Sequence, residues 1–282
     1  KAIRQTQPDE IYNLAAQSNV GESFNQPIYT SMVNAIGTLN VLEAVRTFSP
    51  YSRVFQASSS EIFGKVSVSP QVETTPHRPA NPYGTSKSHA FWSVVNAREN
   101  HNIYATNGIF YNHESSRRPE AFVTRKITSG VASIVAGKQQ KLTLGNLDAR
   151  RDWGFAGDYV EAMWRMLQQE TPEDFIIATG QTTSIRDFVR MAFQEIGVTL
   201  TFEGSQENEI AKVESCTNPA YQLEIGKVVV RVDPSYYRPT EVDLLLGDPT
   251  KAKTQLGWEP QYDLPLLVKE MVHSDLGLVT SD

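Results

Sequence analysis

Short apolar runs alternate with longer segments of helical periodicity along the first half of the chain, and this alternation limits the possible folds most strongly. The predicted strands are residues 11–16, 54–57 and 103–111, and the predicted helices are residues 29–48 and 83–100. Short apolar runs are typical of buried strands, whereas apolar positions three or four residues apart indicate a helix with one buried face. Strands and helices in this order predict an α/β fold, with a parallel sheet covered by helices on its faces.

The second half of the chain predicts a smaller α/β region. Helices are expected over residues 122–136, 156–169, 184–196 and 264–276, with a short one between Asp248-Pro249 and Gly257, and strands over 141–144 and 175–178. Ser184 is a suitable N-cap for the clearest of these helices, and Gly197 follows its end. Residues 203–227 are polar and aperiodic, which predicts a surface excursion. We expect one domain over residues 1–120 and a second mainly over 121–282, with some segments returning to the first sheet.

Composition and charge exclude several classes of protein. Hydrophobic residues make up 40% and charged residues 21% of the 282 positions, which is typical of a globular chain. The net charge of −6 argues against a nucleic-acid-binding protein, and no apolar run approaches the ~18 residues of a membrane helix. The single cysteine, Cys216, cannot form an intrachain disulfide, and the first residues contain no apolar signal core. These features predict a cytoplasmic protein.

Tyr83 and Lys87 provide the sharpest chemical signal. Four residues apart on a helix, they share one face, where a lysine ammonium stabilises the phenolate that makes tyrosine a base. Spacing alone is weak evidence, because Tyr-x-x-x-Lys arises by chance in many proteins. Residues 58–60 are three serines directly after a predicted strand, and ligands of parallel sheets lie beyond the carboxyl ends of the strands. Turn and capping roles for these serines are the alternative interpretation.

Several short sequence motifs together resemble those of the GDP-mannose 4,6-dehydratase family of the extended short-chain dehydrogenase/reductase superfamily. The matching motifs, in chain order, are Tyr12–Ser18, Pro82–Gly84, Asn112–Ser115, Phe122–Ile127, Leu144–Ala149, Arg151–Gly154 and Tyr237–Asp243. With a Tyr-x-x-x-Lys and a hydroxyl residue after the preceding strand, they extend over nearly the whole chain. The resemblance implies a Rossmann-like doubly wound parallel sheet, with its N-terminal part missing, and a smaller C-terminal α/β substrate-binding region.

The resemblance also implies an activity and its catalytic residues. GDP-mannose would be converted to GDP-4-keto-6-deoxy-mannose by hydride transfer from C4 to C6 through tightly bound NADP. Ser59, Glu61, Tyr83 and Lys87 would be the catalytic residues. Glu61 separates a dehydratase from an epimerase, because only dehydration requires removal of the C5 proton; an exposed glutamate in a turn is the alternative.

Binding residues follow from the same resemblance. The domain over residues 1–120 would be the remainder of an NADP-binding Rossmann domain. Its implied cofactor contacts are Leu14, Ala15, Ala16, Gln17, Ser18, Tyr29, Lys87, His113 and Arg118. Those implied for GDP-mannose are Asn112, Lys126, Arg151, Arg238 and Glu241. A structural ion pair is the alternative for Arg151 and for Arg238. The loop with Arg117 and Arg118 is expected to reach a neighbouring subunit in a homo-oligomer, a dimer or tetramer, and a solvated loop is the alternative. No metal site is expected.

The chain departs from the family pattern at several positions. No glycine-rich phosphate loop precedes Ile11, so we expect an N-terminal segment to be missing and the isolated 282 residues to bind NADP poorly or to be inactive. Ser59 replaces the usual threonine and Asn19 the usual histidine, while Ser116 and Pro119 replace a proline and a glycine beside the arginine pair. Another nucleotide-sugar epimerase or reductase, and an inactive relative that only binds nucleotide or partners, remain the competing interpretations.

Overall fold

The computed structural model describes residues 1–66, 68–237 and 244–280, which form two compact units. Unit 1 comprises Lys1–Asn112, Gly157–Gln181 and Leu245–Pro260. Unit 2 comprises His113–Ala156, Thr182–Leu244 and Gln261–Asp282. Each unit therefore contains segments from both halves of the chain.

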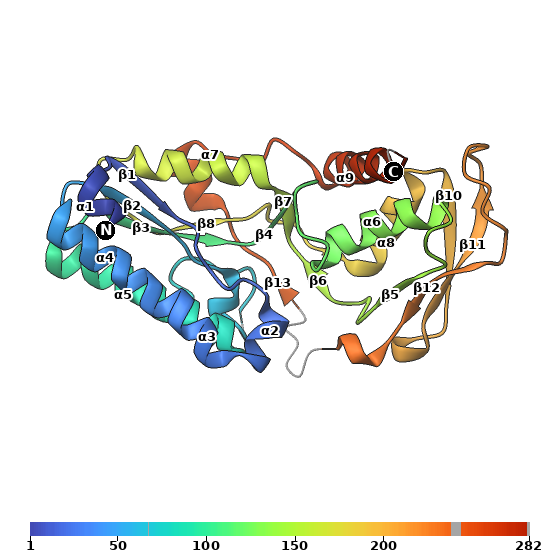
Figure 1. The fold of residues 1–282 in the computed structure, drawn as a ribbon, viewed down its shortest axis with the longest axis horizontal. Helices are drawn as coiled ribbons and strands as arrows, with labels where there is room; N and C mark the ends of the chain where they lie inside the picture. Colours follow the sequence, from blue (N-terminus) through green and yellow to red (C-terminus); the bar gives the residue numbers. More distant parts are fainter. Residues whose placement is uncertain (67, 238–243, 281–282) are drawn as a thin grey trace. The chain divides into compact units, whose positions relative to one another are not determined.

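Unit 1 is built on a parallel sheet with the strand order β1-β2-β3-β8 (Figure 1). Its strands are β1 (Glu10–Asn13), β2 (Arg53–Ala57), β3 (Ala105–Phe110) and β8 (Phe175–Ile177). All three neighbouring pairs run parallel. The expected α/β fold with a parallel sheet is confirmed.

Helices cover both faces of this sheet. The helices α4 (Gly37–Phe48) and α5 (Pro82–His101) lie on one face and α7 (Ala156–Leu167) on the other (Figure 1). Val54 of β2 packs in a cluster with residues of α4 and α5, whereas the next residue, Phe55, packs with residues of α7. Successive side chains of a strand point to opposite faces, so an apolar residue at each of these positions requires a layer of helices on each side.

Shorter elements complete unit 1. They are the helices α1 (Ala2–Thr6), α2 (Val20–Asn25) and α3 (Pro27–Ser31), the 3₁₀ turn η2 (Ser60–Ile62), and the π-helical turns η1 (Met32–Ile36) and η5 (Ala252–Leu256). The helix predicted over residues 29–48 is thus made of α3, η1 and α4 in succession. The strand predicted over residues 11–16 ends at Asn13, and the backbone of Gln17 beyond it is bound by the side chain of Asn34.

Unit 2 contains a mixed sheet with the order β10-β11-β12-β5, in which only the last pair is parallel. The strands are β10 (Val198–Glu203), β11 (Ile210–Cys216), β12 (Val228–Val232) and β5 (Leu142–Leu144). The helices α6 (Val123–Val135), α8 (Ile185–Gln194) and α9 (Leu264–Thr280) share one aliphatic core with this sheet. The prediction of an irregular excursion over residues 203–227 was wrong, because β11 lies inside it. Ala211 and Val213 are buried and alternate with Lys212 and Glu214, a short alternation that the polar composition of the segment outweighed.

The remaining elements of unit 2 are short. They are β4 (Asn112–Glu114) paired with β7 (Trp153–Phe155), β6 (Arg150–Arg151) paired with β9 (Thr183–Ser184), the 3₁₀ turns η3 (Gln206–Asn208) and η4 (Pro234–Tyr236), and β13 (Leu244–Leu245). The predicted N-cap of α8 is confirmed, since the Ser184 hydroxyl accepts a hydrogen bond of 3.0 Å from the Asp187 amide.

The described part of the chain contains no helix that combines the length and apolar character needed to cross a membrane. Within the same residues, no group of three or more histidine, cysteine, aspartate or glutamate side chains is arranged to hold a metal ion.

Candidate active site

The segment that follows β2 brings a hydroxyl and a carboxylate to the carboxyl end of the sheet. Ser59 has an extended backbone and caps η2, and its Oγ accepts a hydrogen bond of 3.2 Å from the Glu61 amide. The hydroxyl hydrogen of Ser59 therefore remains available to another acceptor. Both side chains lie in the interior, with 9% of Ser59 and 8% of Glu61 exposed. The buried position does not fit the alternative of an exposed turn glutamate.

Asn81 connects Glu61 to helix α5. Its Oδ1 caps the helix by accepting from the Gly84 amide at 2.7 Å, and its Nδ2 donates to Glu61 Oε2 at 2.8 Å. A Cβ atom on Gly84 would lie only 2.5 Å from the Glu61 carbonyl oxygen, so the start of α5 touches the segment after β2. Sequence analysis did not identify Asn81, although an asparagine before Pro82 at the start of a helix is a recognisable capping signal.

Tyr83 and Lys87 lie on the first two turns of α5, and both are buried. The Lys87 ammonium lies 5.9 Å from the centre of the Tyr83 ring and donates a hydrogen bond of 2.8 Å to the Ala57 carbonyl at the end of β2. Burial lowers the pKa of Lys87 from 10.5 to about 8. The structure thus gathers Ser59, Glu61, Tyr83 and Lys87 around the carboxyl end of one strand.

A buried polar chain extends from β1 to this cluster. Asn13 and Gln56, which lie opposite each other in the register of β1 and β2, are joined by a hydrogen bond of 2.6 Å. Gln56 also accepts from Thr38 at 3.2 Å and donates to the Ala57 carbonyl at 3.1 Å, so that this carbonyl accepts from both Gln56 and Lys87. Sequence analysis missed these residues; the available signal was a polar amide at the third position of each of the two predicted strands, residues 11–16 and 54–57.

Asn34 anchors the segment expected to line the cofactor groove. Its Oδ1 accepts from the Gln17 amide at 2.8 Å, while its Nδ2 donates to the Gln17 carbonyl at 3.1 Å and to the Ser86 hydroxyl at 3.0 Å. Ser86 directly precedes Lys87, so one buried side chain links the expected groove to helix α5. Asn34 belongs to the π-helical turn η1, a kind of irregularity frequent at functional sites.

The other residues expected to contact the cofactor in unit 1 differ in exposure. Leu14, Ala15 and Ser18 are exposed, as is Tyr29 on α3, whereas Ala16 and Gln17 are half-buried. The exposed side chains of Leu14 and Tyr29 leave apolar surface available to a ligand.

Several other expected binding residues lie on β4, on the turn that follows it and on α6. Asn112 and His113 belong to β4 and are half-buried. Arg118 forms an ion pair of 3.2 Å with Glu114, and its guanidinium lies 3.7 Å from the centre of the Phe122 ring. Arg117 is exposed.

The residues expected to bind the nucleotide sugar are only partly described. The Lys126 ammonium lies 3.6 Å from the centre of the Tyr236 ring. Arg151 is buried and donates to the Arg150 carbonyl at 2.8 Å. Arg238 and Glu241 lie outside the described residues.

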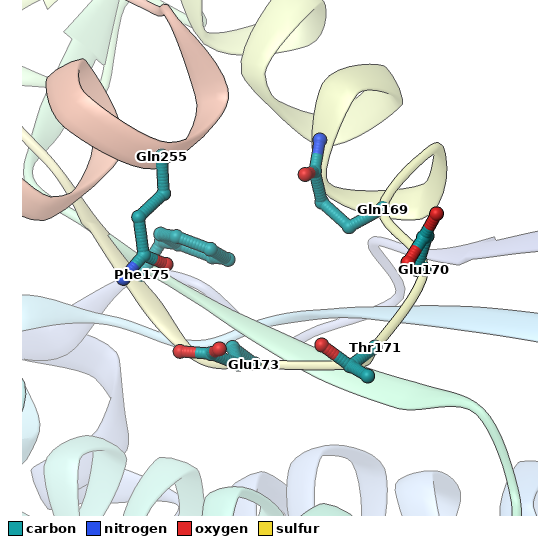
Figure 2. Close-up of a pocket in the computed structure, with 6 residues that line it drawn as sticks. All are labelled: Gln169, Glu170, Thr171, Glu173, Phe175 and Gln255. Atoms are coloured by element: carbon teal, nitrogen blue, oxygen red, sulfur yellow. The ribbon is translucent and has the colours of Figure 1, made fainter.

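A polar hollow occurs at the opposite, amino-terminal edge of the unit 1 sheet. Figure 2 shows its lining, formed by Gln169, Glu170, Thr171, Glu173, Phe175 and Gln255. Phe175 is the first residue of β8, so this hollow lies at the edge where parallel α/β sheets do not place their ligands. We assign it no part in the active site.

Comparison with protein families gives a match over almost the entire chain. The family model described as "GDP-mannose 4,6 dehydratase" matches residues 1–271. The human GDP-mannose 4,6 dehydratase is 52% identical over 284 residues, which cover 100% of this chain and 74% of the relative. The GDP-mannose 4,6-dehydratase of Vibrio cholerae is 50% identical, covering 98% of this chain and 75% of the relative.

Solved structures share the fold at lower sequence identity. The RMD protein of Pseudomonas aeruginosa, complexed with NADPH, has a TM-score of 0.80 at 21% identity, covering 97% of this chain and 83% of that one. The UDP-glucose 4-epimerase of Thermotoga maritima, with UDP-glucose, has a TM-score of 0.79 at 23% identity, covering 100% and 81%. These similarities show a common Rossmann-type fold, and the sequence matches show the closer relationship. The chain belongs to the GDP-mannose 4,6-dehydratase family.

Proposed function

We propose that the protein is a hydro-lyase that converts GDP-mannose to GDP-4-keto-6-deoxy-mannose, with NADP as an internal hydride carrier. The observation that carries the proposal is the Asn81 amide, which joins Glu61 to the helix of Tyr83 and Lys87. Dehydration needs two bases at neighbouring carbons, one at O4 and one at C5. A phenol and a carboxylate attached to one helix start supply both.

The residues present fit the nicotinamide end of NADP. Lys87 has three ammonium hydrogens, one of which is bound to the Ala57 carbonyl, so a ribose hydroxyl could accept another. Gln17 and its neighbours, fixed by Asn34, would line the groove together with Tyr29. The family resemblance adds His113 and Arg118 to the proposed cofactor contacts. When bound, NADP would accept the hydride from C4 and later return it to C6.

Tyr83 acts first in the proposed mechanism. As phenolate it removes the proton from the C4 hydroxyl of the sugar, and the nearby ammonium of Lys87 stabilises its negative charge. Ser59 donates its hydroxyl hydrogen to O4. This hydrogen is available because the Ser59 oxygen acts only as an acceptor in the capping bond. Together these groups convert the C4 alcohol into a ketone as the hydride leaves.

Glu61 acts next. The C4 ketone acidifies the C5 proton, which the Glu61 carboxylate removes, and the C6 hydroxyl departs as water after protonation, for which Ser60 and Glu61 are the neighbouring groups. Return of the hydride to C6 and of a proton to C5 gives the 4-keto-6-deoxy sugar. The overall reaction is loss of one water.

Recognition of the substrate is proposed for residues mainly of unit 2. Lys126 and Arg151 carry positive charge suited to a diphosphate, as does Arg238, while Asn112 and Glu241 supply acceptors for ribose or base. We also propose a homo-oligomer in which the Arg117–Arg118 turn contacts the cofactor of a neighbouring subunit, and a cytoplasmic location, in accord with the single cysteine.

The intact protein, incubated with GDP-mannose and NADP, tests the proposal. We expect a product that has lost one water and carries a C6 methyl group by NMR, without net formation of NADPH. An isomer of unchanged mass would instead indicate an epimerase, and an unchanged substrate in the presence of bound NADP would refute both activities.

A further inference from the structure

Arg125, on the first turn of α6, binds the turn that carries Arg117 and Arg118. Its Nη1 donates to the carbonyls of Ser116 and Arg118, the latter at 3.1 Å. The turn has internal bonds as well, since the Arg118 amide donates to the Ser115 carbonyl at 3.0 Å. One guanidinium nitrogen therefore fixes two carbonyls of the turn.

The other edge of the same guanidinium is held from helix α9. Asp275 Oδ1 accepts from Arg125 Nε at 2.7 Å and from Nη2 at 2.6 Å. Both residues are buried, and α6 packs along α9 within unit 2 (Figure 1). A planar guanidinium with five hydrogens can bind a carboxylate on one side and carbonyls on the other, which a lysine ammonium cannot reproduce in that geometry.

The two arginines of the turn differ in their surroundings. Arg118 is paired with the buried Glu114 and stacks on Phe122. Burial raises the pKa of Glu114, and the positive charge of Arg118 partly offsets this rise. Arg117 is exposed and its amide is bound to the Ser115 hydroxyl at 3.2 Å. The backbone of the turn thus carries one guanidinium packed inward and one directed to solvent.

From these contacts we infer that Arg125, supported by Asp275, is a positioning residue for the Arg117–Arg118 turn. It acts through the turn backbone and touches no reacting atom. This inference rests on the proposed function, in which the turn serves NADP and the contact between subunits. A turn held in one conformation before assembly loses less conformational freedom when a ligand or a second copy of the chain binds it.

The test compares two ion pairs of unit 2. In Arg125→Lys the positive charge remains, but the side chain can no longer bind Asp275 and the two turn carbonyls at the same time. The matched control is Arg186→Lys on α8. Arg186 forms a similar two-point pair with the buried Glu209, at 2.7 and 2.8 Å. The intact holoenzyme is measured for retained NADP after gel filtration, for mass by light scattering, and for thermal unfolding.

We expect Arg125→Lys to weaken NADP retention at least about tenfold, the scale of one lost hydrogen bond to a charged group, or to yield a smaller assembly. Arg186→Lys should lower only the unfolding temperature. Equal NADP retention and equal mass in the two variants would overturn the inference. If Arg125→Lys does not fold, Asp275→Asn, which keeps the size of the side chain, is judged by the same two measurements. Neither readout requires turnover, so absence of dehydratase activity in the wild type would refute the proposed function separately.

Discussion

Replacement of Lys87 by methionine should change stability in a way that depends on pH. Lys87 is 3% exposed, and burial lowers its pKa from 10.5 to about 8. At roughly 1.36 kcal/mol per pKa unit, burial of the ammonium costs folding about 3 kcal/mol at neutral pH. Lys87→Met removes this cost together with the bond to the Ala57 carbonyl, so the variant should be inactive but not strongly destabilised near pH 7.

The direction of the pH dependence follows from proton binding. Between the folded pKa of about 8 and the unfolded value of 10.5, the unfolded chain binds more protons at Lys87 than the folded chain. Stability of the wild type must therefore rise with pH in that window, whereas methionine contributes no such change. The free energy of unfolding of the wild type, minus that of Lys87→Met, should increase by about 2 kcal/mol from about pH 7 to about pH 9.5.

Urea unfolding of cofactor-free protein at several pH values measures this difference, and other titrating groups cancel in the subtraction. Lys253→Met is a suitable control, because Lys253 is exposed and its ion pair with Glu259 raises the pKa. For that control the difference should not increase over the same range. A difference for Lys87→Met that stays constant or falls as pH rises would refute the argument that Lys87 is buried as a cation.

Four further variants test the remaining parts of the site. Tyr83→Phe should reduce turnover at least ~10²-fold, the lower range for a general base, while calorimetry still detects GDP-mannose binding; near-normal turnover would remove Tyr83 from the mechanism. Glu61→Gln should accumulate bound NADPH with little deuterium uptake at C5 from heavy water, and rapid exchange would point to another base. Asn81→Ala should destabilise the protein to urea by about 1 kcal/mol through the lost cap and also slow C5 exchange; unchanged exchange would show that Glu61 needs no support from Asn81. The double variant Arg117→Ala/Arg118→Ala should retain less NADP and scatter light as a smaller assembly, and the pair is ordinary surface charge if both properties are unchanged.

The sequence predicted best what depends on neighbours along the chain. The relation of Tyr83 to Lys87 is fixed by helical spacing, and the parallel sheet follows from the alternation of strands and helices. The cap of α8 by Ser184 is equally local and was also predicted.

Contacts between distant segments could not be predicted in the same way. Asn34 binds Gln17 and Ser86, which are 17 and 52 positions away, and no spacing rule connects them. The bond from Asn13 to Gln56 needs the strand register, which becomes known only once the sheet is assembled. Strand β10 is a different case: Val198 and Leu200 alternate with threonines as a half-buried strand requires, so its signal was present in the sequence but went unrecognised.

Helix α5 gives the reactive groups a common mechanical support. Twenty residues of helix extend about 30 Å, and the far end is clamped by Arg98, which binds both oxygens of Asp174 and the Ala105 carbonyl. Tyr83 and Lys87 lie on this one helix, so if the clamp loosens, their mutual distance persists while their distances to Ser59 change together. Damage at Arg98 should consequently slow oxidation at C4 and, with it, proton removal at C5, whereas damage at Glu61 alone should slow proton removal and leave oxidation at C4 intact.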